Sequence, residues 1–294
     1  MKKTNLSRSL AREAPAKINL FLSVGEKRPD GYHEIESLMQ AVTLCDRLTV
    51  TQTSETGNRI TLSSDHPTLA CDESNLIVRA ARLFFKKTGR EDSVSFHLEK
   101  KIPMAAGLAG GSTDAAAALL LLNELTGAGL SKEELSSLGA SLGADIPFCL
   151  SGGAAIARRI GEKLTRSVGL PDCTVLIACE GEGVSTPEAY RALDAAPRDV
   201  CRDFPAFVSA LEAHDLPKIA GLMTNDFEKV ICPRRPIVSE LCRRMEEAGA
   251  LRAMMSGSGP SVFGLFCDEQ KAAVLQKQFV GEGINSFLCR PYFE

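Results

Sequence analysis

The sequence predicts an α+β fold of two domains, and three observations support that class. The chain has 294 residues, of which 44% are hydrophobic, so it can bury the cores of two ordinary domains. Strand-like and helix-like segments follow one another without a regular βαβ repeat, which argues against a doubly wound sheet. Gly, Lys, Arg and Pro cluster at residues 161–171, between two predicted strands. We therefore place a boundary there, between a domain at 1–164 and a domain at 165–294.

The first half of the chain contains the clearest strand and helix patterns. Apolar and polar residues alternate over residues 16–24, which predicts a half-buried strand with Lys17 and Asn19 on the same face. Alanine and leucine dominate residues 112–125, and Gly127 follows them, so we expect a helix with a glycine stop. Further elements are predicted as a turn at 28–31, strands at 42–51, 58–62, 93–98 and 153–159, and helices at 74–88 and 131–142.

The second half is predicted to alternate shorter strands and helices. No internal repeat or low-complexity segment interrupts it. The predicted strands are 173–179, 251–255, 260–267 and 284–290, and the predicted helices are 204–213, 236–248 and 270–280.

Composition and charge narrow the function classes. The 34 basic and 37 acidic residues nearly balance, which argues against a dedicated nucleic-acid binder. No apolar stretch reaches the ~20 residues of a membrane span, and the polar segment before Pro15 does not resemble a signal peptide. The 10 cysteines include no C-x-x-C pair, so we expect free, buried thiols rather than a zinc site. These features predict a cytoplasmic protein without a membrane or nucleic-acid partner.

A glycine-rich loop before the strongest predicted helix is the most informative segment. Residues 101–117 read Lys-Ile-Pro-Met-Ala-Ala-Gly-Leu-Ala-Gly-Gly-Ser-Thr-Asp-Ala-Ala-Ala. Small residues let backbone amides approach an anion, and a helix N-terminus adds free N–H groups and positive partial charge. A nucleotide triphosphate needs both features, and Ser112 and Thr113 offer hydroxyls to phosphate or Mg²⁺. The loop is neither G-x-x-x-x-G-K-[ST] nor G-x-G-x-x-G, and a tight turn packed under the helix is the structural alternative.

Three other segments carry candidate functional residues. Asp145 follows a helix stop and precedes Pro147, which we interpret as a rigid break, so it is either a fixed general base or a turn residue. Lys17 lies on a strand that looks central, so its ammonium needs a partner or a cavity. The Gly/Ser loop at 253–261 is either a connection between strands or a ligand contact.

These motifs together resemble those of a known family. The segment in which Pro103 precedes the run Gly107–Thr113 is similar to the phosphate loop of the GHMP kinase superfamily. Residues 15–20, 28–33 and 143–148 resemble segments of those GHMP kinases that act on a cytidine diphosphate-linked methylerythritol. The likeness covers nearly the whole chain in order and ends at the Ser/Gly loop.

The resemblance implies a role for each matching residue. Asp145 corresponds to the catalytic base, and Lys17 corresponds to the lysine paired with it. The implied ATP-binding residues are Pro103, Met104, Ala105, Ala106, Gly107, Leu108, Ala109, Gly110, Gly111, Ser112, Thr113, Asn75, Leu76 and Lys100. The implied substrate-binding residues are Asn19, Tyr32, His33, Thr186 and Tyr190, with cytosine between the two tyrosines. No residue is assigned as a metal ligand.

The family also implies a fold, cofactors and a reaction. The N-terminal domain should be a ribosomal-protein-like layered domain and the C-terminal domain ferredoxin-like. ATP and Mg²⁺ would phosphorylate the 2-hydroxyl of the methylerythritol substrate, in the non-mevalonate route to isoprenoid precursors. We expect a monomer or weak homodimer.

Three residues differ from many relatives of that family. Ala106 and Ala109 replace glycines, which we expect to be tolerated where φ is negative, and Thr113 replaces serine but keeps a hydroxyl. Two other functions remain possible beside phosphorylation of the methylerythritol substrate. The first is a GHMP kinase for homoserine or a mevalonate derivative, and the second is an inert ligand sensor on the same fold. A Rossmann dehydrogenase is disfavoured by the loop spacing.

Overall fold

The computed structural model describes residues 8–53, 57–181, 183–196 and 202–293. The chain divides into two compact units, which are assembled from separate segments: unit 1 from residues up to 16, 45–102 and 110–151, and unit 2 from 17–44, 103–109 and 152–294. The long strands β1 (Ser9–Lys27) and β2 (His33–Gln52) each contribute residues to both units. The predicted boundary between residues 164 and 165 stays a prediction.

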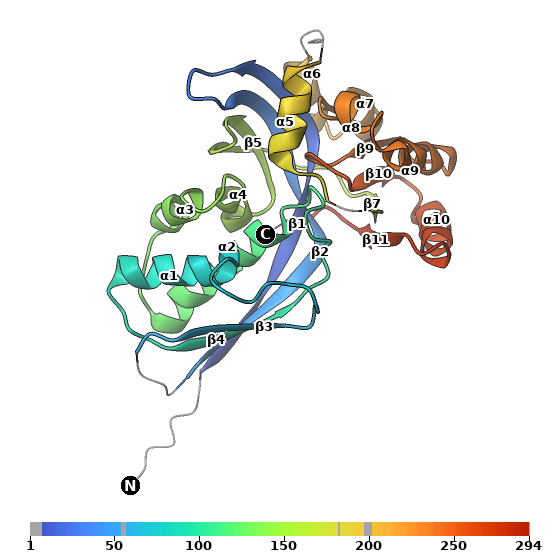
Figure 1. The fold of residues 1–294 in the computed structure, drawn as a ribbon. Coiled ribbons are helices and arrows are strands. Elements are labelled where there is room, and N and C mark those ends of the chain that lie inside the picture. Colours follow the sequence, from blue (N-terminus) through green and yellow to red (C-terminus); the bar gives the residue numbers. More distant parts are fainter. Residues whose placement is uncertain (1–7, 54–56, 182, 197–201, 294) are drawn as a thin grey trace. The chain divides into compact units, whose positions relative to one another are not determined.

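Unit 1 places helices on one face of a sheet (Figure 1). Strand β4 (Val94–Glu99) pairs antiparallel with the second half of β2 and parallel with β3 (Ile60–Ser64). Helices α1 (Leu76–Thr88) and α2 (Gly110–Thr126) lie side by side over these strands. The shorter helices α3 (Lys132–Ala140) and α4 (Ile146–Ser151) pack on α2.

The core of unit 1 explains why these segments fold together. Phe84, Phe85 and Phe96 are almost completely buried in it. The four alanines at 115–118 join the same core, so α2 can approach its neighbours closely. Local signals set the helix ends: Ser131 and Glu134 form a capping box at the start of α3, and Gly89 ends α1 with a φ of 66°.

Unit 2 contains a ferredoxin-like β-α-β-β-α-β arrangement. Among the described residues, its sheet has the strand order β11-β7-β10-β9, with antiparallel neighbours throughout. The chain runs through β7 (Thr174–Cys179), α9 (Pro236–Glu247), β9 (Arg252–Met255), β10 (Val262–Phe266), α10 (Glu269–Gly281) and β11 (Asn285–Cys289). Helices α9 and α10 cover one face of this sheet. That order of elements confirms the predicted fold class for the C-terminal part.

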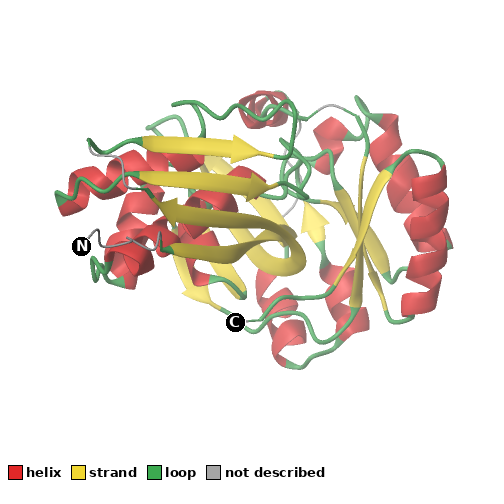
Figure 2. Ribbon diagram, turned by 90° about the horizontal axis from the view of Figure 1, so that it is seen from below, coloured by secondary structure: helices red, strands yellow, loops and turns green. Residues whose placement is uncertain are grey.

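Among the described residues, the remaining elements of unit 2 are three strands, which join the sheet that contains β1 and β2, and four helices. Strand β5 (Ala154–Arg159) pairs antiparallel with the first half of β2 and with β6 (Lys163–Arg166), and β8 (Thr224–Asn225) pairs parallel with β1. The other helices are α5 (Thr186–Asp194), α6 (Phe204–Glu212), α7 (Leu216–Leu222) and α8 (Glu228–Ile231). Strands and helices segregate into layers, as expected for an α+β fold (Figure 2).

Several sequence-based expectations about elements were wrong. Pro147 does not break the chain, since it lies in the first turn of α4, where proline has no N–H to lose. Strand β1 begins at Ser9 rather than at residue 16, and α2 begins at Gly110 rather than at Ser112. Strand β6 occupies part of the segment that we took as a boundary, and α5, α7 and α8 were not predicted.

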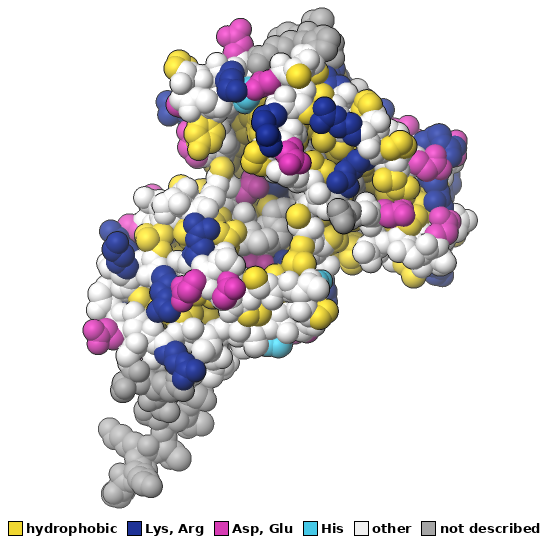
Figure 3. Space-filling view, viewed as in Figure 1, with side chains coloured by type: hydrophobic (Ala, Val, Ile, Leu, Met, Phe, Trp, Pro, Cys, Tyr) yellow, Lys and Arg dark blue, Asp and Glu magenta, His cyan; other side chains and the backbone are white. Residues whose placement is uncertain are grey.

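The surface agrees with the balanced composition. Figure 3 shows Lys and Arg side chains interspersed with Asp and Glu on the visible face of each unit. Within the described ranges, no helix is long and apolar enough to cross a membrane. The nine described cysteines are free, but Cys71 and Cys267 are exposed rather than buried, and Cys201 lies outside the described residues.

Candidate active site

In unit 2, the first half of the glycine-rich loop packs on the Ser/Gly loop that follows β9. Ser256 Oγ donates a 3.0 Å hydrogen bond to the carbonyl oxygen of Gly107, and the Ser261 N–H donates to the carbonyl of Ala106 at 3.2 Å. A Cβ atom on Gly107 would lie 2.1 Å from the carbonyl oxygen of Ser256. Only glycine fits there, because its φ of 78° is also unfavourable for other residues. The two Gly/Ser loops therefore form one backbone-rich structure.

The backbone of this loop departs from what we expected at one alanine. Ala109 has a φ of 57°, in the left-handed region, so the condition of negative φ fails there. Ala105 adopts a φ of 52° in the same loop, whereas Ala106 has no such conformation. A left-handed non-glycine residue costs about 1–2 kcal/mol, so the loop holds strain at two alanines.

Lys17 and Asn19 meet on one face of β1, as their spacing predicted. The Lys17 ammonium donates a 2.6 Å hydrogen bond to Oδ1 of Asn19, and both residues are at most 5% exposed. Asn19 Nδ2 donates to Ser37 Oγ at 2.9 Å, and Ser37 donates to the carbonyl of Phe21 at 2.7 Å. The Lys17 N–H also donates to the carbonyl of Leu108, 3.1 Å away, which ties β1 to the loop. Within unit 2, the buried ammonium thus has a neutral acceptor, and it is suited to bind an anion.

In unit 1, the second half of the loop becomes the first turn of α2. Gly110 has no room for a side chain, because a Cβ there would lie 2.9 Å from Lys100 Nζ and 3.1 Å from Ile102. Gly111 is exposed, and a Cβ on it would meet only Leu76, at 3.5 Å. The unpaired N–H groups of this 17-residue helix and its positive partial charge favour an anion at this end.

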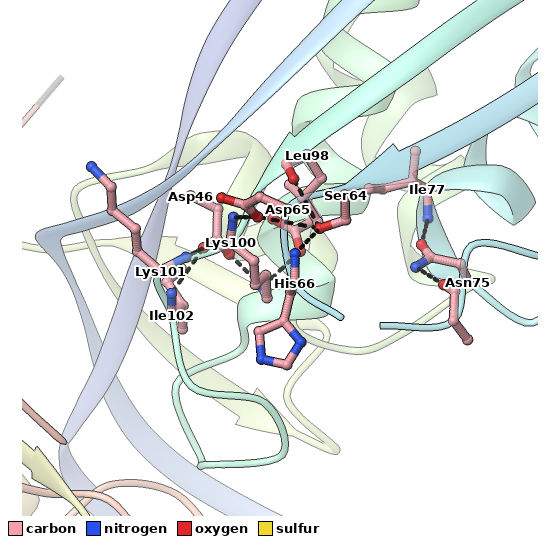
Figure 4. A network of polar contacts seen from close by, with 12 residues as sticks. Asp46, Ser64, Asp65, His66, Asn75, Ile77, Leu98, Lys100, Lys101 and Ile102 are labelled. Atoms are coloured by element: carbon pink, nitrogen blue, oxygen red, sulfur yellow. Dashed lines mark hydrogen bonds and ion pairs between the residues drawn. The ribbon is translucent and has the colours of Figure 1, made fainter. Parts of the chain in front are cut away.

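A buried charge cluster holds the chain just before that helix (Figure 4). The ammonium of Lys100 forms ion pairs with Asp46 and, at 2.8 Å, with Asp114. Asp46 Oδ1 also accepts the N–H groups of Lys101, at 2.6 Å, and Ile102, at 2.8 Å. Burial raises the pKa of Asp114 to about 7, Asp46 adds to that rise, and Lys100 opposes it. The cluster therefore joins β2, the loop entry and α2.

Two of the residues assigned to adenine use their polar groups inside the protein. Lys100 Nζ is occupied by the two aspartates, and its backbone N–H donates to Asp65 at 2.8 Å. Its side chain is only 3% exposed, so only its backbone carbonyl is left for a ligand. Asn75 caps α1: Oδ1 accepts from Ile77 N–H at 2.9 Å, and Nδ2 donates to the carbonyl of Ala70 at 2.7 Å (Figure 4). Any contact that they make with adenine would thus leave these bonds in place.

Asp145 stands immediately before α4. Its carbonyl accepts the N–H of Cys149 at 3.1 Å, so its backbone belongs to the start of that helix. Its side chain is half-buried and has no hydrogen-bond or ion-pair partner in unit 1 among the described residues. A carboxylate with free lone pairs on a fixed backbone is suited to accept a proton.

The aromatic residues assigned to the nucleobase lie in unit 2, and the structure brings together two of the three. The rings of His33 and Tyr190 stack with centroids 5.0 Å apart and planes 18° apart. Tyr32 is 61% exposed and contributes no ring contact within the described chain. Thr186 lies at the start of α5, where its hydroxyl is 3.1 Å from that of Ser258.

Sequence reasoning missed three acidic residues of this region. Asp46 and Asp114 neutralise Lys100, and Asp194 accepts a 2.6 Å hydrogen bond from His33 Nε2. Asp114 directly follows the loop motif. An acidic residue in a largely apolar helix indicates a buried charge that needs a partner, and this signal could have identified Asp114. Asp46 and Asp194 are distant in sequence from their partners, and no local spacing indicates them.

Comparison with known proteins agrees with this geometry. The model of the GHMP kinases N terminal domain matches residues 75–153, and that of the GHMP kinases C terminal matches residues 207–284. A protein of Syntrophomonas wolfei named 4-diphosphocytidyl-2-C-methyl-D-erythritol kinase is 38% identical, over 98% of this chain and 100% of its own. A protein of the same name from Bacillus pumilus is 41% identical, over 96% of this chain and 95% of its own.

Solved structures agree on the fold. A 4-(cytidine 5'-diphospho)-2C-methyl-D-erythritol kinase superposes with a TM-score of 0.80 at 33% identity, covering 97% of this chain and 100% of that one. Homoserine kinase from Cytophaga hutchinsonii has a TM-score of 0.75 at 21% identity, with 99% and 97% covered, which shows the fold alone.

The fold and the two loop halves thus define an ATP-dependent small-molecule kinase of the GHMP class. The full-length similarity then gives the particular family. The chain belongs to the 4-diphosphocytidyl-2-C-methyl-D-erythritol kinases.

Proposed function

We propose that this kinase transfers the γ-phosphoryl group of ATP to the 2-hydroxyl of 4-diphosphocytidyl-2-C-methyl-D-erythritol, in the non-mevalonate route to isoprenoid precursors. The observation that supports this most is the full-length identity of about two residues in five with relatives of that name, together with the buried Lys17 and the two packed Gly/Ser loops. The nucleotide would bind over residues 103–113, where small residues and the start of α2 expose backbone N–H groups.

The protein's work in this reaction is positioning and charge neutralisation. The substrate oxygen forms a bond to the γ-phosphorus as the bond to the β,γ-bridging oxygen breaks and ADP leaves. Asp145 would accept the hydroxyl proton, since its carboxylate has unused lone pairs. Lys17 would stabilise negative charge on the transferring group. Asn19 would keep the ammonium in place through its 2.6 Å hydrogen bond.

Mg²⁺ would neutralise the negative charge of the phosphate groups. The described residues offer no cluster of three or more His, Cys, Asp or Glu side chains for a metal. Such a cluster is not required, because Mg²⁺ at nucleotides takes most ligands from phosphates and water. The Ser112 hydroxyl, in the first turn of α2, is of the oxygen type that suits the ion. The residues present therefore fit Mg²⁺.

The experiment that tests the proposal compares three acceptors. Purified protein would be incubated with ATP, Mg²⁺ and either the cytidine diphosphate-linked methylerythritol, homoserine or mevalonate, and ADP release would be measured. We expect turnover with the first acceptor only, and ³¹P–¹³C couplings to the carbon that bears the 2-hydroxyl, which carries no hydrogen, should place the phosphate there. Turnover with homoserine or mevalonate instead would overturn the substrate assignment. Ligand binding without turnover of any acceptor would favour the inert sensor.

A further inference from the structure

A histidine that is hydrogen-bonded to an aspartate lies beside the aromatic residues of unit 2. Nε2 of His33 is 2.6 Å from Oδ1 of Asp194, the last residue of α5. The other oxygen of that carboxylate accepts a 2.9 Å hydrogen bond from Lys27 Nζ. The His33 side chain is only 5% exposed, whereas Asp194 is 27% exposed. The proposed catalytic steps use neither Asp194 nor Lys27.

The charge on Asp194 decides which His33 nitrogen carries the proton. The hydrogen bond from Lys27 lowers the pKa of the Asp194 carboxyl, and the bond from His33 lowers it further, so the group is ionised. An ionised carboxylate only accepts hydrogen bonds, so Nε2 must donate. In a neutral imidazole, the other nitrogen is then a lone-pair acceptor.

The acceptor nitrogen is available to a ligand. Nδ1 of His33 has no hydrogen-bond partner among the described residues. Among the described residues, the fully buried side-chain nitrogen and oxygen atoms that lack a partner do not include this Nδ1. The nitrogen is therefore in contact with solvent.

The neighbouring rings set the plane in which such a ligand lies. Tyr190 stacks on His33 with an interplanar angle of 18°, and Phe227 contacts Tyr190 edge-on with centroids 4.9 Å apart. A planar base that hydrogen-bonds to the edge of the imidazole would therefore lie nearly parallel to the Tyr190 ring, as offset aromatic stacking favours.

The geometry points to Asp194 as the positioning residue that makes this site select cytosine over uracil. By accepting from Nε2, Asp194 leaves Nδ1 of His33 as an acceptor for the exocyclic amino group of cytosine. Uracil has a carbonyl oxygen at that position, so two acceptors would face each other. The inference rests on the proposed function for the cytidine part of the substrate, and it adds a residue and a reason for base selectivity.

The decisive measurement is the ratio of affinities for cytidine and uridine monophosphate. We expect the wild-type protein to bind CMP about 5- to 150-fold more tightly than UMP in calorimetry, the range that 1–3 kcal/mol of base discrimination gives. In Asp194→Asn, the amide can donate to Nε2 and drive the proton to Nδ1, which becomes a donor. The ratio should then fall at least about tenfold, the effect of 1.4 kcal/mol, or invert in favour of UMP.

Two further variants separate the tautomer from general damage. Asp194→Ala removes the partner without imposing a tautomer, so its ratio should lie between those of the wild type and Asp194→Asn. Lys27→Met removes the neighbouring cation but keeps the carboxylate, so it should retain the preference for CMP. The ¹⁵N shifts of His33 should show a proton on Nε2 in the wild type and on Nδ1 in Asp194→Asn, a change that a purely structural role would not produce.

The outcomes distinguish this inference from the proposed function. Equal binding of CMP and UMP by the wild type, binding of neither, or an unchanged ratio in Asp194→Asn would each overturn the role of Asp194. If the ratio responds as expected but the protein does not phosphorylate the cytidine diphosphate-linked substrate, the inference about the base holds and the proposed reaction fails.

Discussion

Lys17 and Asn19 form a 2.6 Å hydrogen bond between their side chains on one face of β1, where both are buried. An ammonium in that position is costly unless an anion lies nearby. This relationship explains why the site is suited to a negatively charged reacting group, and it leads to the first prediction.

Lys17→Met should lower kcat about 100-fold, the effect of removing one group that stabilises transition-state charge. The melting temperature should stay the same or rise, because an apolar side chain of similar length replaces a desolvated charge. Steady-state kinetics and thermal unfolding check both results, with exposed Lys86→Met as the control. A change confined to KM would show that Lys17 only binds a ligand.

Asp145→Asn should abolish most turnover, by about 100-fold or more, because an amide cannot accept the hydroxyl proton. ATP and acceptor affinities, measured by calorimetry, should change little. Asp215→Asn is a matched control, since Asp215 caps α7 and asparagine caps as well. A variant at position 145 that keeps most of its kcat would remove this residue from the role of base.

Tyr190→Ala should weaken binding of the cytidine substrate roughly 5- to 150-fold, because base–aromatic stacking contributes about 1–3 kcal/mol. ATP affinity should be unaffected, since adenine is assigned to residues of unit 1. The measurement is calorimetric titration with each ligand separately. Loss of ATP binding with retained cytidine binding would mean that we have exchanged the two pockets.

Ala109→Gly should stabilise the protein by about 1 kcal/mol, because it relieves a left-handed alanine whose φ is 57°. Ala106→Gly is the matched control in the same loop. It should destabilise by about 0.5–1 kcal/mol, because Ala106 has no positive φ and glycine adds unfolded-state freedom. Chemical denaturation measures both. If Ala109→Gly is the less stable of the two, the strain assigned to this loop is absent.

Asp114→Asn should change how stability depends on pH. The pKa of Asp114 rises from 3.8 to about 7 on folding, mainly through burial, so the folded protein binds an extra proton between these values. Stability from this group is therefore present at low pH and falls as the pH rises to 7. The free energy of unfolding of the variant, relative to that of the wild type, should be larger at pH 8 than at pH 5, so the variant is relatively more stable at pH 8.

A second aspartate provides the control for that experiment. Asp72 is exposed, and hydrogen bonds from Ser74 lower the pKa of its carboxyl, which gives the opposite sign. The stability from this group is complete above its ordinary pKa of 3.8 and is lost only at lower pH, so Asp72→Asn should differ from the wild type by the same amount at pH 5 and at pH 8. Identical pH profiles for the Asp114 variant and the wild type would refute the raised pKa.

Elements with a strong local pattern could be predicted from the sequence, and those without one could not. The capping box of α3 and the glycine stop of α1 depend on residues a few positions apart, so local physics decides them. Strand β1 extends back to Ser9 through a polar segment because Ser9 Oγ donates to the carbonyl of Val50 on β2. Pairing with a neighbour stabilised a strand that its own composition did not indicate.

The candidate site divides in the same way. Residues 103–113 could be found because phosphate binding requires small residues next to one another and next to a helix start. The structural role of the Lys100 ammonium could not be found in this way, because its charge is neutralised by Asp46, which lies 54 positions away in the sequence. An assignment made by position alone therefore gave Lys100 an adenine contact without revealing where its ammonium points.

The sequence by itself determined the α+β class, the GHMP loop and the candidate base and lysine, because each rests on a contiguous pattern or a fixed spacing on one strand. Only the tertiary structure decided that Gly107 packs on Ser256 and that His33 pairs with Asp194, 161 positions further along the chain. Such contacts depend on strand order and register, which bring distant residues within hydrogen-bond distance and leave no local spacing in the sequence.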